Sequence, residues 1–244
     1  MITIQNKITP ALNRATVLEL NRKITPPLNC RSILCEDTHQ SEQAPVQKKS
    51  SSPMPSVREK FTGKHPVIKG QKVDLNVQKE QQIKACFGWN TKDARCDIDV
   101  SAFLLTDFGR VPDDSWFVFY GQKISPDRSV FLAVGDRNKV QEYIGIDFRK
   151  LNAAIKKIVF VLTIDQAFQK NLNFSMVDDA YIKIEDRRGE ELVSFKMEEY
   201  YENATSMVIG ELYLHNGKWK FNPVGNGIHQ DLAGQCAVYG VEIS

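Results

Sequence analysis

The sequence predicts an all-β protein: a β-sandwich of two mainly antiparallel sheets with a short C-terminal helix, preceded by a disordered N-terminal arm. Three observations lead to this prediction. From Gly70 onward, short segments of alternating or continuous apolar residues follow one another, with turn-forming residues between them. Segments with helical periodicity are rare in this part of the chain. The residues before it are rich in proline and poor in aromatic side chains.

The predicted arm covers residues 1–66, and the predicted domain covers residues 67–244. Seven of the ten prolines lie in the arm, where Phe61 is the sole aromatic residue. The stretch at 40–56 is rich in Ser, Gln, Pro and Lys, and such a composition cannot bury enough apolar surface to offset the entropy lost on folding. Up to Lys64 the arm has ten Lys or Arg against five Asp or Glu, a net charge of about +5. We therefore expect a flexible, basic arm.

A short sequence recurs within the arm. Lys-Ile-Thr-Pro-Ala-Leu-Asn at residues 7–13 returns as Lys-Ile-Thr-Pro-Pro-Leu-Asn at residues 23–29. Two interpretations are open: the copies are paired docking motifs, or they are a duplication in sequence that has no structural constraint.

The strands of the domain follow from the apolar pattern, taken in chain order. They are predicted at 73–77, 83–89, 98–105, 117–120, 129–134, 143–148, 157–163, 180–184, 191–197, 205–214 and 218–221. Asn216-Gly217 provides the tight turn between the last two strands. One helical turn is predicted at 151–155, and a closing helix at 228–239 has apolar residues on one face. In the strand at 83–89, the alternation predicts that Trp89 points into the sandwich beside Phe87.

The strand at 98–105 carries acidic residues on one face. Side chains alternate along a strand, so Ile98, Val100 and the apolar residues after them share one side, and Asp97, Asp99 and Ser101 share the other. Two carboxylates at about 7 Å repel each other unless a cation or solvent screens them. Oxygen ligands without sulfur or imidazole point to calcium or magnesium. The alternative is a solvated strand face.

The composition limits the class of protein. A net charge of +2 gives no sign of a nucleic-acid partner, and five cysteines without a CxxC pair argue for a reducing compartment. The longest strongly apolar run, Ile158 to Ile164, is too short to cross a bilayer, and the N-terminus has no apolar signal region. Signatures of hydrolase, metalloprotease, P-loop and kinase active sites are absent. We therefore expect a cytoplasmic protein that is not an enzyme.

A set of short blocks between about residues 68 and 241 resembles, in order and with compatible spacing, the TerD family of tellurium-resistance and stress proteins. The blocks are Gly70-Gln71-Lys72, Gly88-Trp89, Asp97-Ile98-Asp99-Val100-Ser101-Ala102-Phe103-Leu104-Leu105, Phe117-Val118-Phe119-Tyr120, Ser125-Pro126-Asp127, Gly135-Asp136, Ile158-Val159-Phe160-Val161, Gly210-Glu211-Leu212-Tyr213, Gly217-Lys218-Trp219-Lys220-Phe221, Val224-Gly225-Asn226-Gly227 and Tyr239-Gly240. The resemblance implies a β-sandwich with calcium in an acidic cleft, a role in the bacterial stress response and no established catalytic activity. It also implies protein partners in a membrane-bound complex, and therefore a place in the cytoplasm at the inner membrane without spanning it.

Carried over residue by residue, the resemblance implies a set of calcium ligands: Asn90, Asp97, Asp99, Asp127, Asp136 and Glu142. The chain departs from the family pattern, because Asn90 stands where the family usually has Asp, and the acidic loop after Asp136 is shortened. Positive charges at Arg128, Arg137 and Lys139 are predicted to lie where the cation would bind. Two functional hypotheses remain: a calcium-modulated stress-response binding module, and a metal-free protein-interaction scaffold with a degenerate calcium site.

Overall fold

The structure is a computed structural model that describes residues 61–77, 82–136, 140–199 and 201–242. Its strands, in chain order, are β1 (Pro66–Val67), β2 (Val73–Asp74), β3 (Gln82–Thr91), β4 (Ile98–Leu105), β5 (Phe117–Val118), β6 (Val130–Val134), β7 (Glu142–Asp147), β8 (Lys157–Ile164), β9 (Val177–Asp186), β10 (Glu191–Lys196), β11 (Ser206–His215) and β12 (Lys218–Ile228). Its helices are the short 3-10 turns η1 (Asp114–Trp116) and η2 (Phe174–Met176), and the α-helices α2 (Ala167–Lys170) and α3 (Leu232–Tyr239).

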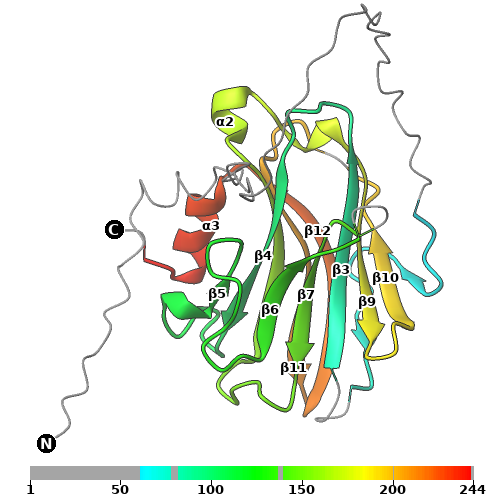
Figure 1. The fold of residues 1–244 in the computed structure, drawn as a ribbon, viewed down its shortest axis with the longest axis vertical. Coiled ribbons are helices and arrows are strands. Elements are labelled where there is room, and N and C mark those ends of the chain that lie inside the picture. The colour runs from blue at the N-terminus through cyan, green and yellow to red at the C-terminus, as the bar shows by residue number, and fades with distance from the viewer. Residues whose placement is uncertain (1–60, 78–81, 137–139, 200, 243–244) are drawn as a thin grey trace, which may run out of the picture.

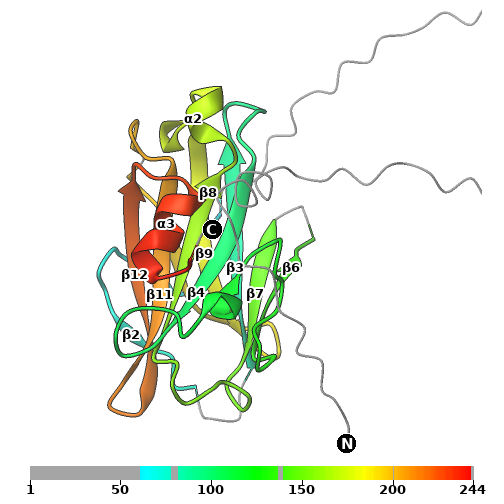
Figure 2. The same cartoon turned by 90° about the vertical axis from the view of Figure 1, so that its left-hand side faces the viewer.

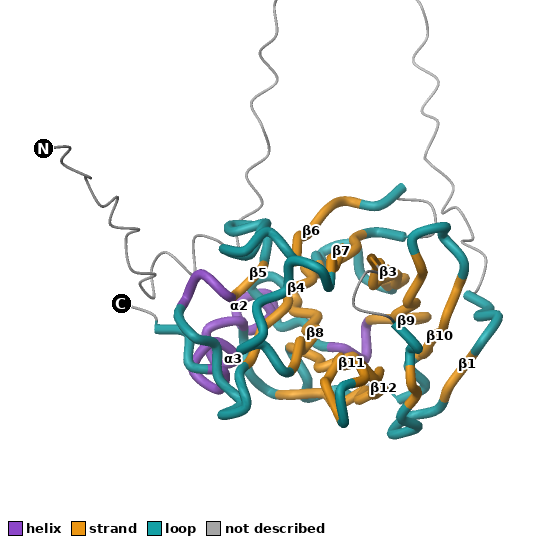
Figure 3. Tube along the Cα trace, turned by 90° about the horizontal axis from the view of Figure 1, so that it is seen from below, coloured by secondary structure: helices purple, strands orange, loops and turns teal. Residues whose placement is uncertain are grey.

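The strands form two six-stranded sheets packed face to face, which confirms the predicted all-β sandwich with a short C-terminal helix (Figure 1). Sheet A has the strand order β1-β10-β9-β3-β7-β6, and sheet B has the order β2-β12-β11-β8-β4-β5. Neighbouring strands are antiparallel except for β1, which runs parallel to β10. The view along the strands shows the two layers, with α3 beside sheet B (Figure 3).

The sandwich interior is filled by alternate residues of the two sheets. Phe87 of sheet A meets Phe160 of sheet B edge to face, with ring centroids 5.5 Å apart. Because the side chain of Phe160 points inward, the residues that alternate with it point to the outer face of sheet B. That outer face is covered as well, since Tyr239 of α3 packs on Phe103 of β4 with centroids 4.5 Å apart (Figure 2). Every residue of β4 is therefore buried.

The last residues of the predicted arm lie on sheet A. The Phe61 ring stacks on Tyr181 at 3.7 Å between centroids, and its N–H donates to Asp179 Oδ2 at 2.7 Å. Pro66 and Val67 then form β1 beside β10. The chain next crosses to sheet B, where Gly70 N–H donates to the Pro223 carbonyl at 2.8 Å. We call residues 61–77 the strap, because they join the edges of both sheets. Of the flexible arm predicted at residues 1–66, residues 1–60 lie outside the described residues.

Local predictions fail in three places. Residues 151–155 form turns rather than a helical turn, and the closing helix begins at Leu232 because β12 continues to Ile228. Trp89 packs against the core but is only half-buried. The pairing of β3 with β9 shifts between Gly88 and Asn90, and this bulge interrupts the alternation on which the prediction rested.

Among the described residues, no helix is long and apolar enough to span a membrane.

Separate truncations test the role of the strap. Removal of residues 1–60 is expected to leave the free energy of unfolding almost unchanged, as the composition of this segment predicts. Removal of residues 1–66 is expected to lower it by about 2–4 kcal/mol, because the aromatic stack and the charge-assisted hydrogen bond of Phe61 are lost. Urea denaturation of both truncated proteins measures the difference. Equal stability would show that Phe61 contributes nothing to folding.

A second pair of variants tests the bulge at Trp89. Phe87→Ala removes a fully buried ring and is expected to cost about 3–5 kcal/mol of unfolding free energy. Trp89→Ala removes a half-buried ring and is expected to cost about 1–2 kcal/mol, because less apolar surface returns to water. Urea denaturation of the two variants is the measurement. A Trp89→Ala loss as large as that of Phe87→Ala would place the indole in the interior after all.

Candidate functional site at the acidic end of the sandwich

The start of β4 and the end of β8 bring acidic side chains together on the outer face of sheet B. Asp99 lies directly opposite Thr163 in the antiparallel register, which places their Cβ atoms roughly 5 Å apart. Beyond the last pair, Asp165 N–H donates to the Asp97 carbonyl at 2.8 Å. Strand alternation therefore places Asp97, Asp99, Thr163 and Asp165 on one face, together with Ser101.

This face is not a solvated strand surface. Asp99 is 9% exposed and Ser101 is 3% exposed, whereas Asp97 is half-buried. Helix α3 closes the face further along, where Gln235 Nε2 donates to Ser206 Oγ at 3.1 Å. The alternative of a solvated face is therefore wrong for Asp99 and Ser101.

Four oxygen atoms of this region are buried without a hydrogen-bond partner: Ser101 Oγ, Tyr120 OH, Thr163 Oγ1 and Asp165 Oδ1. Burial, and after it the charges of Asp99 and Asp165, raise the pKa of the Tyr120 hydroxyl. A buried polar atom without a partner costs about 1–3 kcal/mol, so such atoms normally bind water or an ion. We call Asp97, Asp99, Ser101, Tyr120, Thr163 and Asp165 the Asp99 cluster.

Sequence reasoning missed Asp165. The signal was present, because this residue directly follows the most apolar strand of the chain, at the position where strand ends carry polar groups. Its other carboxylate oxygen, Oδ2, forms an ion pair with Lys170 Nζ of α2 at 2.9 Å. The side chain of Asp165 is 7% exposed, so this pair is largely shielded from solvent.

Lysines also pair with the acids of β9 at this end of the sandwich. Lys92 Nζ lies 3.1 Å from Asp178 Oδ1, and Lys196 forms an ion pair with Asp179. Arg128, predicted to neutralise the aspartates, lies instead in the turn before β6, at the other end of the strands. The other two predicted cations, at 137 and 139, lie outside the described residues.

Asp127 lies far from the other predicted calcium ligands. Its Oδ1 accepts hydrogen bonds from Ser129 N–H at 2.9 Å and from the hydroxyls of Ser125 and Ser129, and its Oδ2 accepts from Asn152 N–H at 2.8 Å. These bonds stabilise a turn that precedes β6, whereas Asp136 follows β6. The five residues of that strand separate the two carboxylates by more than about 13 Å.

The remaining predicted ligands belong to sheet A. Glu142 begins β7, and its Oε2 accepts a hydrogen bond from Val100 N–H at 2.8 Å, on the open edge of β4. The Asp136 carboxylate accepts a hydrogen bond from Val140 N–H at 3.1 Å. Asn90 lies opposite Asp178 in β3. Within the described ranges, no three His, Cys, Asp or Glu side chains are arranged to hold a metal ion.

The sequence is similar to those of proteins named for tellurium resistance and for general stress. The tellurium resistance protein TerD of Serratia marcescens is 36% identical over 165 residues, which cover 64% of this chain and 86% of that protein. General stress protein 16U of Bacillus subtilis is 32% identical over 188 residues, 72% of this chain and 97% of that protein.

A further sequence relative, a solved structure and a family model match about the same part of the chain. The uncharacterized protein YceE of Bacillus subtilis is 34% identical over 186 residues, 72% of this chain and 97% of that protein. A solved structure of a protein of unknown function, SAV2460, has a TM-score of 0.53 and 18% identity, over 68% of this chain and 99% of that chain, and shows the shared fold alone. The family model of the TerD domain matches residues 64–239, most of the chain. This protein therefore belongs to the TerD domain family.

Proposed function

We propose that this chain is a non-enzymatic binding module of the stress response whose acidic end binds calcium. The relatives named for tellurium resistance and for general stress support the first part. The observation that carries the second part is the set of buried oxygen atoms without partners in the Asp99 cluster. A cation at this position would satisfy these atoms and remove the repulsion between the neighbouring carboxylates.

The oxygen atoms of the cluster are suitable calcium ligands, but their present positions do not form a complete coordination shell. Carboxylate oxygens of Asp97, Asp99 and Asp165 and the hydroxyls of Ser101 and Thr163 are hard ligands of the kind that calcium prefers. Calcium takes six to eight oxygens, so the side chains must move closer and water must complete the shell. Asp165 would also have to leave Lys170. The proposed site keeps Asp97 and Asp99 of the predicted ligands, and Asp127 is too distant to contribute.

The second candidate is a metal-free interaction scaffold on the same fold. It is favoured by the lysines that pair with the acids here, above all Lys170 with Asp165 at 2.9 Å. An ammonium group placed in this way does part of the electrostatic work of a metal ion. In both candidates we propose that the protein acts in the cytoplasm and binds protein partners, among them a stress complex bound to the inner membrane. Neither candidate includes a nucleic-acid partner.

Thermal unfolding with and without calcium distinguishes the two candidates. For the first candidate, calcium is expected to raise the melting temperature of the full chain. An ion that binds only the folded state increases the free energy of unfolding by RT ln(1 + [L]/Kd), which is about 2.7 kcal/mol when the calcium concentration is 100 times Kd. The double change Asp97→Asn and Asp99→Asn is expected to abolish this rise. Without calcium, the double variant is expected to be at least as stable as the wild type, because the repulsion is lost.

Control variants make the result specific. Asp127→Asn removes a carboxylate that stabilises a distant turn, so it is expected to lower stability and leave the calcium response intact. Lys170→Gln removes the cation that competes for Asp165, so it is expected to strengthen calcium binding. A wild type that does not respond to calcium, with a Lys170→Gln variant that loses about 1–3 kcal/mol, would establish the metal-free scaffold instead.

A further inference from the structure

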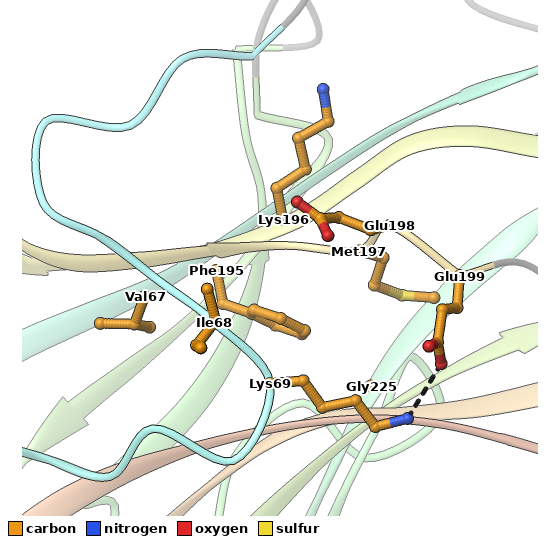
Figure 4. Close-up of a pocket in the computed structure, with 9 residues that line it drawn as sticks. All are labelled: Val67, Ile68, Lys69, Phe195, Lys196, Met197, Glu198, Glu199 and Gly225. Atoms are coloured by element: carbon orange, nitrogen blue, oxygen red, sulfur yellow. Dashed lines mark hydrogen bonds and ion pairs between the residues drawn. The ribbon is translucent and has the colours of Figure 1, made fainter.

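A hollow opens at the side of the sandwich where the strap leaves sheet A and crosses to sheet B (Figure 4). It has a volume of about 80 Å³, several times the roughly 10–15 Å³ that one water molecule needs. Phe195 and Met197, both buried core residues, line it, and Ile68 of the strap forms an outer wall with 72% of its surface exposed. The hollow therefore lies at the edges of the two sheets and is lined by these apolar side chains together with charged ones, namely Lys69, Lys196, Glu198 and Glu199.

A glycine keeps this hollow open. Gly225 of β12 has a φ of +58°, a conformation that side-chain-bearing residues rarely adopt. A Cβ atom at this position would lie 3.0 Å from the ring of Phe195. Any larger residue would therefore be strained and would press on the ring that lines the hollow.

The rim of the hollow carries an acidic group without a partner. Lys69 Nζ pairs with Glu199 at 3.2 Å, and Lys196 pairs with Asp179, so both cations are already engaged. Glu198 is exposed and forms no hydrogen bond or ion pair with the described part of the chain. A hollow with these apolar residues and such a carboxylate fits an aliphatic side chain that is followed or preceded by a basic residue.

The arm of the same chain contains this chemistry twice. In each repeat a lysine stands directly before an isoleucine, at Lys7-Ile8 and Lys23-Ile24. The threonine that follows stands before proline, and residues in that sequence position generally favour an extended backbone. A sequence with such a restricted choice of conformations loses less conformational entropy when it binds in an extended form.

The arm also begins close to the hollow. It joins the described structure at Phe61, which is fixed on Tyr181, and Val67 lies in the wall of the hollow six residues later. Residues 30–60 connect Asn29 to Phe61, and by the scaling for linkers a chain of that length reaches roughly 30 Å on average. Such a tether gives an effective concentration in the millimolar range, so a weak contact is enough for substantial occupancy.

We infer that the hollow binds the repeated segment of its own arm, with Ile8 or Ile24 inserted between the sheet edges and the adjacent lysine beside Glu198. The two copies compete for one position, which raises the occupied fraction without a second site. A protein partner that presents a similar segment would have to displace the arm.

Peptide competition tests this inference in the full chain. The probe is a fluorescent peptide of residues 22–29, and its affinity is measured by anisotropy for the wild type and for a variant with Ile8→Ser and Ile24→Ser. The variant is expected to bind the peptide about 3–10-fold more tightly, because its own arm no longer competes. Equal affinities, or no binding to either protein, would overturn the inference.

Matched surface variants locate the binding position. Ile68→Asp, made in the arm variant, is expected to weaken peptide binding at least 10-fold. Phe108→Asp changes a residue that is 92% exposed in a distant loop and is expected to have no effect. Unchanged binding to the Ile68→Asp protein would exclude this hollow. If the competition in the wild type increases with protein concentration, the arm of a second copy is the competitor, and the proposal of binding within one chain is wrong.

Discussion

The burial of both faces of β4 and β8 is the constraint on which the rest of the structure depends. Their inner faces fill the sandwich, and their outer faces lie under α3 and the loop that carries Tyr120. Asp99, Ser101 and Thr163 on the outer face are therefore removed from water. At Asp99 and Ser101 this burial turns an ordinary alternation of apolar and polar residues into a cluster of carboxylates and hydroxyls with unsatisfied oxygen atoms.

Charge balance at this end follows from that burial. Removing a carboxylate from water is unfavourable unless a cation or several donors replace the lost hydration. Asp165 has Lys170, Asp179 has Lys196 and the N–H of Phe61, and Glu142 has the N–H of Val100. These partners reduce the net negative charge that a metal ion would neutralise. With them in place, the acidic end can remain folded without calcium.

Much of the fold could be predicted from the sequence, because alternating apolar residues reveal strands regardless of their partners. The bulge at Trp89 could not, since it arises from the pairing of β3 with β9. The candidate site was harder for the same reason. Asp127 and Asp136 look equivalent along the chain, yet β6 places them at opposite ends. Asp165 can be noticed in the sequence as the polar residue that follows an apolar strand, but its place beside Asp97 depends on the pairing of β8 with β4, which the local pattern does not specify.

The strap connects the acidic end of the sandwich to the hollow. Asp179 accepts the N–H of Phe61 and pairs with Lys196, and Lys196 lies in the wall of the hollow. Two residues, Asp179 and Lys196, therefore connect the start of the strap, the acidic end and the wall of the hollow. Asp179 adopts a φ of +57°, which costs about 1 kcal/mol or more for a residue other than glycine, and its hydrogen bond and ion pair offset that cost. The carboxylate of Asp179 therefore helps to fix the start of the strap on sheet A, together with the stack of Phe61 on Tyr181.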